Sequence, residues 1–141
     1  MAILDQHQAT PTKVLLDTVI TQVSGGKDNA LFLDVLGEVY GVGGKLGGKL
    51  GKGSFWTNPL NTPIKISNLS SISYVFASHK TSFFIESTGE VWGCGDNTSG
   101  ELGNVFLPSQ GFKKYVVSPI KLKVTAAILQ QASQVKSART A

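Results

Sequence analysis

One sequence unit occurs twice in this chain, and the repeat constrains the fold more than any other feature. When the chain is displaced by 52 residues, residues 11–51 lie over residues 63–103, with 13 identical pairs among these 41 positions. The identities gather in two stretches, which are residues 37–43 over 89–95 and residues 48–51 over 100–103. A repeat at a fixed period predicts an array of similar supersecondary units that pack on their neighbours.

The end of the unit returns once more and sets the boundaries of the repeats. Pro63-Ile-Lys-Ile66 recurs as Pro119-Ile-Lys-Leu122, displaced by 56 residues, so the second unit carries about four inserted residues. We divide the chain into a mobile lead-in (1–10), a first repeat that starts with the last strand of a preceding unit (11–66), a second repeat (67–124) and a tail (125–141). The tail is either the start of a third repeat or a short helix, which its Ala, Leu and Gln residues favour.

Both units are predicted to consist of β-strands. Their segments are short, rich in β-branched and aromatic residues, and bounded by Gly or Pro, and residues 11–124 lack helical periodicity. The predicted strands are 18–23, 30–35, 38–43, 70–76, 82–87 and 90–95, with weaker ones at 63–66 and 119–124. Tight hairpins are expected at Leu36-Gly37 and Thr88-Gly89, where Gly accepts a positive φ. The fold class is therefore all-β, with units the size of a four-stranded antiparallel propeller blade.

The spaced glycines resemble a known repeat. The pattern Gly-x-Val-x3-Gly-x-Asn-x2-Gly-x-Leu-Gly is formed in the second unit by Gly89, Val91, Gly95, Asn97, Gly100, Leu102 and Gly103, and in the first by Gly37, Val39, Gly43, Gly48, Leu50 and Gly51. This pattern resembles the repeat of the regulator of chromosome condensation family over residues 11–124. The resemblance implies a β-propeller, which in that family has seven blades.

Three departures from the family pattern stand out. The first unit has Lys45 where the pattern has Asn, and Asn29 and Thr81 occupy the position where the family usually has His. The chain also holds about two units, which leaves two outer faces and their sheet edges uncovered. We therefore expect a fragment of a longer protein, a ring closed by copies of this chain, or a subunit that docks on another protein.

Composition restricts the remaining classes. With 41% hydrophobic residues the chain can form a core, no apolar run is long enough for a membrane-spanning helix, and the first residues do not resemble a secretory signal. The single cysteine excludes an intramolecular disulfide. These features predict an intracellular protein, without distinguishing cytoplasm, nucleus, cilium or organelle. A net charge of +4 favours acidic partners but is small for nucleic-acid binding.

A nucleotide site is suggested by the first unit and then excluded. Gly43-x4-Gly48-Lys49 matches the start of a phosphate-binding loop, but Leu50 stands where Ser or Thr would hold magnesium, and another Gly follows instead of a helix. Lys45, Lys49 and Lys52 form either a local basic patch or a solvated loop.

Catalytic and metal-binding constellations are missing from the sequence. The two histidines are His7, in the lead-in, and His79, which aligns with a lysine, and Cys94 aligns with a valine in a predicted strand. Glu38 and Glu90 occupy equivalent hairpin positions and are expected to face solvent. We therefore predict no catalytic residue, cofactor or metal, and no enzyme activity.

The two long loops, 52–62 and 104–118, are the better candidates for function, because recognition usually lies on loops carried by a rigid scaffold. The possible partner-binding residues are Lys45, Lys49, Lys52, Phe55, Trp56, Phe112, Lys113, Lys114 and Tyr115. The alternative is that these aromatic residues pack on a neighbouring blade. The sequence thus favours a protein-interaction or scaffold module that binds other subunits or copies of itself. A guanine-nucleotide exchange factor for a small GTPase, as the resemblance implies, is the alternative, and chromatin or nucleic-acid binding through basic loops is the weakest.

Overall fold

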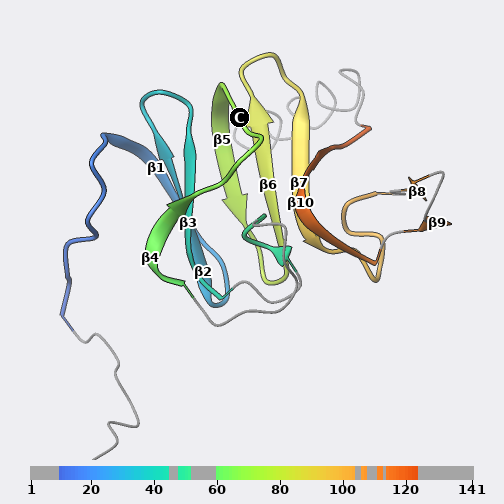
Figure 1. The fold of residues 1–141 in the computed structure, drawn as a ribbon, viewed down its shortest axis with the longest axis horizontal. Coiled ribbons are helices and arrows are strands. Elements are labelled where there is room, and N and C mark those ends of the chain that lie inside the picture. The colour runs from blue at the N-terminus through green and yellow to red at the C-terminus, as the bar shows by residue number, and fades with distance from the viewer. Residues whose placement is uncertain are drawn as a thin grey trace, which may run out of the picture.

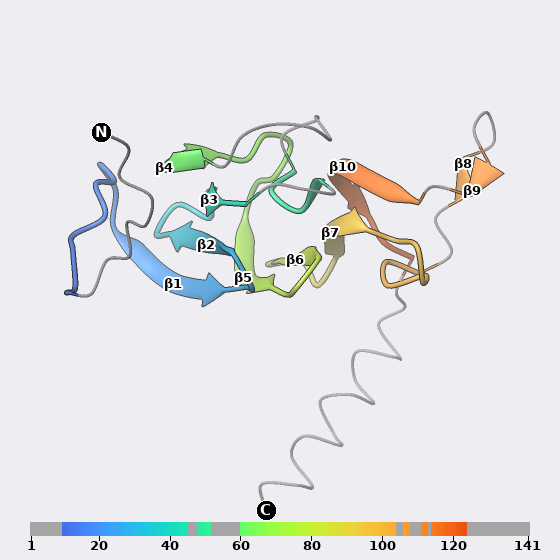
Figure 2. The ribbon, with the colours of Figure 1, turned by 90° about the horizontal axis from the view of Figure 1, so that it is seen from below.

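Two four-stranded antiparallel sheets, each built from one repeat, stand side by side (Figures 1 and 2). The structure is a computed structural model that describes residues 10–44, 48–51, 60–103, 106–107, 111–112 and 114–123. Within these residues there is no α-helix, and no helix that could span a membrane. The predicted all-β, propeller-type fold with about two four-stranded blades is confirmed.

The first sheet, called blade 1, has the strand order β1-β2-β3-β4, and the second, blade 2, has the order β10-β7-β6-β5. The strands of blade 1 are β1 Ile20–Gly25, β2 Asn29–Asp34, β3 Val39–Gly43 and β4 Leu60–Lys65. Those of blade 2 are β5 Ile72–Ala77, β6 Thr81–Glu86, β7 Val91–Asp96 and β10 Tyr115–Lys121. A small hairpin, β8 Phe106–Leu107 and β9 Gly111–Phe112, lies within the loop that was predicted over 104–118.

The outer strands differ most from their predicted bounds. Both β4 and β10 begin earlier than predicted, and each changes register with its neighbour, between Gly41 and Gly43 in blade 1 and between Val116 and Ile120 in blade 2. Pro63 and Pro119 lie at the equivalent place in these irregular stretches. Proline lacks the N–H of a regular ladder and is therefore confined to edge strands and bulges, which these strands provide.

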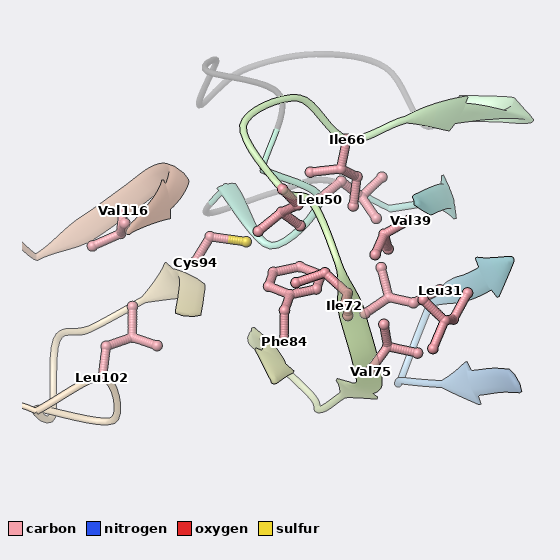
Figure 3. Close-up of a cluster of buried hydrophobic side chains, with 12 residues drawn as sticks. Leu31, Val39, Leu50, Ile66, Ile72, Val75, Phe84, Cys94, Leu102 and Val116 are labelled. Atoms are coloured by element: carbon pink, nitrogen blue, oxygen red, sulfur yellow. The ribbon is translucent and has the colours of Figure 1, made fainter. Parts of the chain in front are cut away.

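The hydrophobic core lies mainly between the two blades (Figure 3). Blade 1 contributes Leu31, Leu33, Val39, Leu50 and Ile66, and blade 2 contributes Ile72, Val75, Phe84, Cys94 and Val116. Phe84 and Val75 are fully buried in this core. Two sheets packed face to face bury one side of each, and the other side of each blade carries exposed side chains, such as Val23 in blade 1 and Tyr74 in blade 2.

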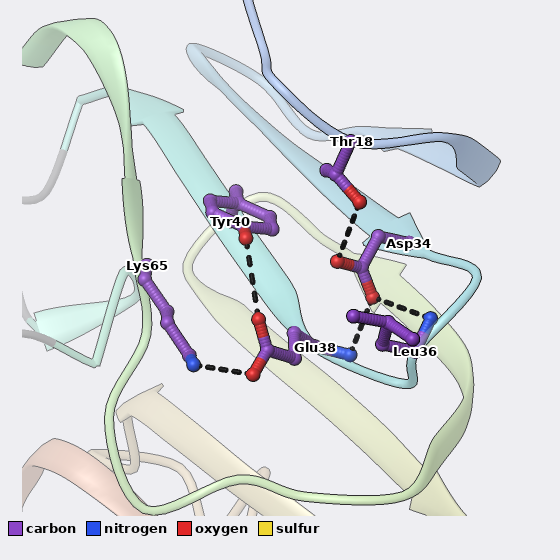
Figure 4. A network of polar contacts seen from close by, with 6 residues as sticks. All are labelled: Thr18, Asp34, Leu36, Glu38, Tyr40 and Lys65. Carbon is purple, nitrogen blue, oxygen red and sulfur yellow. Dashed lines mark hydrogen bonds and ion pairs between the residues drawn. The ribbon is translucent and has the colours of Figure 1, made fainter.

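The predicted hairpins form around glycines with positive φ. Gly37 has φ +79° and Gly89 has φ +92°. In the first hairpin, the Asp34 carboxylate accepts hydrogen bonds from the backbone N–H groups of Leu36 at 2.9 Å and Glu38 at 2.8 Å (Figure 4). These bonds satisfy the amides of the turn, which fixes the register of β2 against β3.

Candidate protein interface

The contact between the two blades, which we call the inner interface, shows how one blade packs on the next. The Gln22 side chain donates from Nε2 to the Val75 carbonyl at 3.0 Å and accepts from the Val75 N–H at 3.1 Å, and Ser24 Oγ accepts from the Ala77 N–H at 2.9 Å. Side chains of β1 thus satisfy the backbone of β5, which is an edge strand. We call this set of contacts the inner clamp.

A second contact is made by the turn at residues 48–51. Gly48 and Gly51 approach blade 2 so closely that a Cβ on them would lie 2.7 Å from Val117 Cα and 2.8 Å from Pro119 Cδ, respectively. The carbonyl of Lys49 accepts a hydrogen bond from Ser82 Oγ at 2.6 Å. The motif glycines are therefore required for positive φ and also for contact with the following blade.

Lys49 is held inside this contact. Its ammonium group pairs with the Asp28 carboxylate and lies 3.4 Å from the carbonyl of His79 in blade 2, and its side chain is only 5% exposed. Lys49 is therefore not part of an exposed basic patch. Its equivalent in blade 2 is Glu101, and the equivalent of Asp28 is Lys80, so the two charges are exchanged between the repeats.

On the outer face of blade 2, strand β5, which is the equivalent of β1, carries different side chains. At the positions of Gln22 and Ser24 stand Tyr74 and Phe76, which are 56% and 48% exposed. Their rings stack with centroids 6.3 Å apart and an interplanar angle of 13°. An exposed aromatic pair at the place of the inner clamp marks a surface suited to an apolar partner.

The motif glycines of blade 2 are correspondingly uncovered. A Cβ on Gly37 would lie 3.0 Å from Ser71 Cα of blade 2, and a Cβ on Gly48 or Gly51 would lie closer still to that blade. Their equivalents Gly89, Gly100 and Gly103 have no atom within 4 Å of such a Cβ. Blade 2 thus presents the surface that blade 1 uses against blade 2.

The outer face of blade 1 is the converse surface. Val23 is 60% exposed, whereas its equivalent Val75 is fully buried between the blades. A groove of about 750 Å³ lies on this face, bounded by Val42 of β3, by Asn61, Thr62 and Pro63 of β4, and by residues 10–15. Val14 and Leu15 beside it are 48% and 81% exposed.

Truncating these two valines is expected to give unequal losses of stability. Val75→Ala creates a cavity between the blades and should lower the free energy of unfolding by about 1–3 kcal/mol, whereas Val23→Ala should change it by less than about 0.5 kcal/mol. Urea denaturation of both variants measures the difference. Equal losses would contradict the assignment of Val23 to an open face.

The two hairpin glutamates, which the sequence predicts to face solvent, form ion pairs with the outer strands. Glu38 accepts a hydrogen bond from the Tyr40 hydroxyl at 3.3 Å and pairs with Lys65 of β4 (Figure 4). Burial and the Glu38 carboxylate raise the pKa of Tyr40, and the hydrogen bond to Glu38 raises the pKa of Lys65. Glu90 pairs with Lys121 in the same way, so both glutamates tie an outer strand to its hairpin.

The structure places Cys94 in the core and His79 on the surface. Cys94 is fully buried, and burial raises the pKa of its thiol far above the usual range, so it holds its proton and is not a nucleophile. His79 lies exposed in the turn between β5 and β6. Among the residues that the structure describes, no three His, Cys, Asp or Glu side chains gather as metal ligands.

Asp96 links stability to acidity. Burial tends to raise its pKa, but hydrogen bonds from Thr98 at 2.8 and 2.6 Å and the Lys80 ammonium at 3.7 Å outweigh it, so the pKa lies below its usual value. A lowered folded-state pKa stabilises the protein above the unfolded value and loses that effect as pH falls through the folded value.

The stability of the chain is therefore expected to decline as the pH falls below about 4, with part of the decline due to Asp96. Asp96→Asn should make the decline shallower, because the amide does not titrate. Thermal unfolding followed from pH 6 to pH 2.5 measures both slopes. Parallel curves for the two proteins would contradict this role of Asp96.

The other sequence-predicted partner residues are only partly placed. Lys114 is exposed and its carbonyl accepts a hydrogen bond from the Asn97 N–H at 2.6 Å, and Tyr115 is 36% exposed at the start of β10. Phe112 belongs to the β8–β9 hairpin. Lys45, Lys52, Phe55, Trp56 and Lys113, like the lead-in through residue 9 and the tail, lie outside the described residues.

Sequence reasoning missed Tyr74 and Phe76. It assigned them to a predicted strand and gave them no role, although they occupy the positions in the second repeat that Gln22 and Ser24 occupy in the first. Alternation along a strand identifies one outward face but does not show which face a neighbouring blade covers. The polar-to-aromatic change between the two repeats was the signal that could have found them.

Comparison with known proteins identifies the architecture. No protein-family model matches the sequence, and no curated protein matches it. Solved structures do. Human WBSCR16 superposes with a TM-score of 0.62 at 26% identity over 79% of this chain, and yeast RCC1 (Prp20), solved with Kap60, with a TM-score of 0.70 at 26% identity over 84%. The chain has an RCC1-like repeat fold.

The RCC1-like fold is present here as a small part of the whole propeller. The match covers 27% of the WBSCR16 chain and 26% of the yeast RCC1 chain. The crystal structure of Prp20p of Saccharomyces cerevisiae, a protein with described binding properties to Gsp1p and histones, matches 84% of this chain and 27% of its own, at 24% identity with a TM-score of 0.66. The chain thus spans about a quarter of these proteins.

Proposed function

We propose that this chain is a non-enzymatic interaction module that supplies two RCC1-like blades to a larger protein assembly. One observation carries the proposal. Residues that the inner interface buries, such as Val75, have exposed equivalents on the outer face of blade 1, and the outer face of blade 2 carries the exposed pair Tyr74 and Phe76. Exposed apolar surface on both sides of a two-blade unit is typical of a protein–protein interface.

The expected partner is a protein, because the open faces are sheet surfaces with apolar side chains. Tyrosine and phenylalanine bury a large area at little conformational cost and often form the centre of an interface. The nearby basic side chains add little, since Lys49 is paired and Lys80 lies near Asp96.

The double variant Tyr74→Gln with Phe76→Ser tests the proposal, because it places the residue types of the inner clamp on blade 2. Both side chains are about half exposed, so the free energy of unfolding should change by less than about 1 kcal/mol. Proteins captured by the tagged chain from its native cells are identified and re-bound in purified form, and the double variant should lose them.

Leu36→Ser is the matched control for this experiment. Leu36 is 72% exposed at a hairpin tip, and its equivalent in blade 2 is the polar Thr88, so the site tolerates a hydroxyl. The control should retain binding. Equal binding by wild type and the double variant would overturn the proposed interface.

Nucleotide exchange on a small GTPase is the second candidate, because Prp20p, which has the same fold, has described binding properties to Gsp1p. The activity would appear as faster release of a fluorescent guanine nucleotide from a panel of small GTPases when the chain is added. Unchanged release rates across the panel would remove this candidate and leave the interaction module.

A further inference from the structure

We propose that a second copy of this chain docks head-to-tail on the outer face of blade 1 and seats its turn 100–103 in the groove beside β4. The inference rests on the proposed function, because it names the partner of one open face. It follows from the inner interface, which serves as a template for the contact between copies.

The groove on blade 1 corresponds to the surface of blade 2 that the turn 48–51 contacts in the inner interface. In the inner interface the turn 48–51 contacts Val117 and Pro119 of β10. Their equivalents in blade 1, displaced by 56 residues, are Asn61 and Pro63, and both line the groove. Val42, which also lines it, is the equivalent of Cys94, whose Sγ lies 3.5 Å from the carbonyl of the seated turn.

The turn 100–103 already has the conformation that the seat receives. Gly100 and Gly103 have φ of +78° and +79°, close to the +84° and +62° of Gly48 and Gly51. The Gly103 N–H donates a hydrogen bond to the Gly100 carbonyl at 2.9 Å, just as the Gly51 N–H donates one to the Gly48 carbonyl at 2.8 Å. A turn formed before binding loses little conformational entropy on docking.

Asn97 holds this turn in place. Its Oδ1 accepts the N–H of Leu102 at 2.8 Å, and its side chain is fully buried. Leu102 packs against Gly93, where a Cβ would lie 2.8 Å from Leu102 Cδ2, and Leu50 packs against Gly41 at 2.9 Å by the same measure. The leucine that supports the turn is therefore arranged alike in the two blades.

The side chains of β5 in the docking copy and of β1 in the receiving copy are complementary in size. Phe76 replaces Ser24 on the docking face, and on the receiving face Gly25 replaces Ala77, so the larger side chain meets the smaller. A Cβ on Gly25 would have no neighbour within 4 Å, which leaves room for the ring. Docking would cover the aromatic pair of one copy and Val23 of the other.

Contact within one chain is excluded by the position of the two parts. The groove is on the outer side of blade 1 and the turn 100–103 follows β7 of blade 2, at the opposite side of the molecule (Figure 1). A contact between unlike faces is heterologous, so it adds copies in one direction and closes a ring where the rotation permits.

Disulfide trapping between separately purified single-cysteine variants tests the geometry. The template contact of Gln22 with Val75 predicts that Tyr74→Cys in one copy meets Val23→Cys in the other, and the contact of the Lys49 carbonyl with Ser82 predicts that Glu101→Cys meets Ala30→Cys. All four positions are exposed or partly exposed and avoid the motif glycines, and Cys94 is buried and does not compete. Each variant is first checked for a wild-type melting curve.

The crossed mixtures are the controls. Tyr74→Cys with Ala30→Cys, and Glu101→Cys with Val23→Cys, use the same four proteins in pairs that the template does not bring into contact. Under mild oxidation the two cognate mixtures should give severalfold more mixed dimer than the crossed ones. Equal yields in all four mixtures would overturn the inference.

The solution mass of the unmodified chain provides a measurement that does not depend on variants. Light scattering should give a mass that rises above 14.9 kDa with concentration. A constant monomer mass would overturn the inference. If that monomer still binds another protein through Tyr74 and Phe76, the proposed function stands, and if it binds none, both fail.

Discussion

Gly95→Ala is expected to lower the free energy of unfolding by about 3 kcal/mol or more. The Cβ would lie 2.3 Å from the Lys80 carbonyl oxygen and 2.8 Å from Thr81 Cα, and both are backbone atoms that cannot turn aside. The φ of Gly95 is +118°, which a residue with a Cβ rarely adopts. The Lys80 carbonyl also accepts a hydrogen bond from the Asp96 N–H at 2.9 Å. A shift of this carbonyl away from the added Cβ would therefore break the pairing of β6 with β7 at this end.

Gly89→Ala separates the two causes of this loss. Gly89 has φ +92° but open space around the added Cβ, so only the backbone strain of about 1–2 kcal/mol applies, partly offset by the lower entropy of the unfolded chain. Denaturant titration of dilute protein measures both variants. Equal losses for Gly95→Ala and Gly89→Ala would show that the close approach at Gly95 is not as described.

Phe84→Ala is expected to lower the free energy of unfolding by about 3–5 kcal/mol, because it removes the largest fully buried side chain among the described residues from the core between the blades. Phe84 lies at the centre of the cluster in Figure 3, between residues of both sheets. The cavity should reduce contact between the blades as well as total stability. The readouts are the urea midpoint and amide hydrogen exchange of β2 and β5.

Phe83→Ala is the matched variant on the other face of the same strand. Phe83 is only partly buried and points to the outer side of blade 2, so its loss should be clearly smaller, about 1–2 kcal/mol. A larger loss for Phe83→Ala than for Phe84→Ala would contradict the assignment of the two faces of blade 2.

Much of the fold could be predicted because the two copies of the repeat show the same pattern at equivalent positions. The identities at positions 52 residues apart predicted strands that the structure places within a few residues, and the hairpin glycines have the expected positive φ. The outer strands were less visible, since Pro63 and Pro119 interrupt the ladder. The β8–β9 hairpin has two residues in each strand, too few for a periodic pattern.

The candidate interface was predictable in kind but not in place. The repeat count predicted uncovered blade faces, yet sequence reasoning looked for partner-binding residues in the loops and took Lys49 as a surface charge. Lys49 is buried because the turn that carries it is pressed against blade 2, a tertiary contact that its neighbours in sequence do not reveal. Tyr74 is a candidate because its equivalent in blade 1, Gln22, is hydrogen-bonded to the other blade, a contact that the sequence does not reveal.

The native mass of the chain tests the central claim most directly. The wild-type chain, tagged and expressed in its own cells, should elute from size exclusion in a complex clearly larger than 14.9 kDa, and Tyr74→Gln with Phe76→Ser should elute near the mass of the free chain. A wild-type chain that elutes at 14.9 kDa in the native extract would contradict the account, because its open faces would then bind no protein.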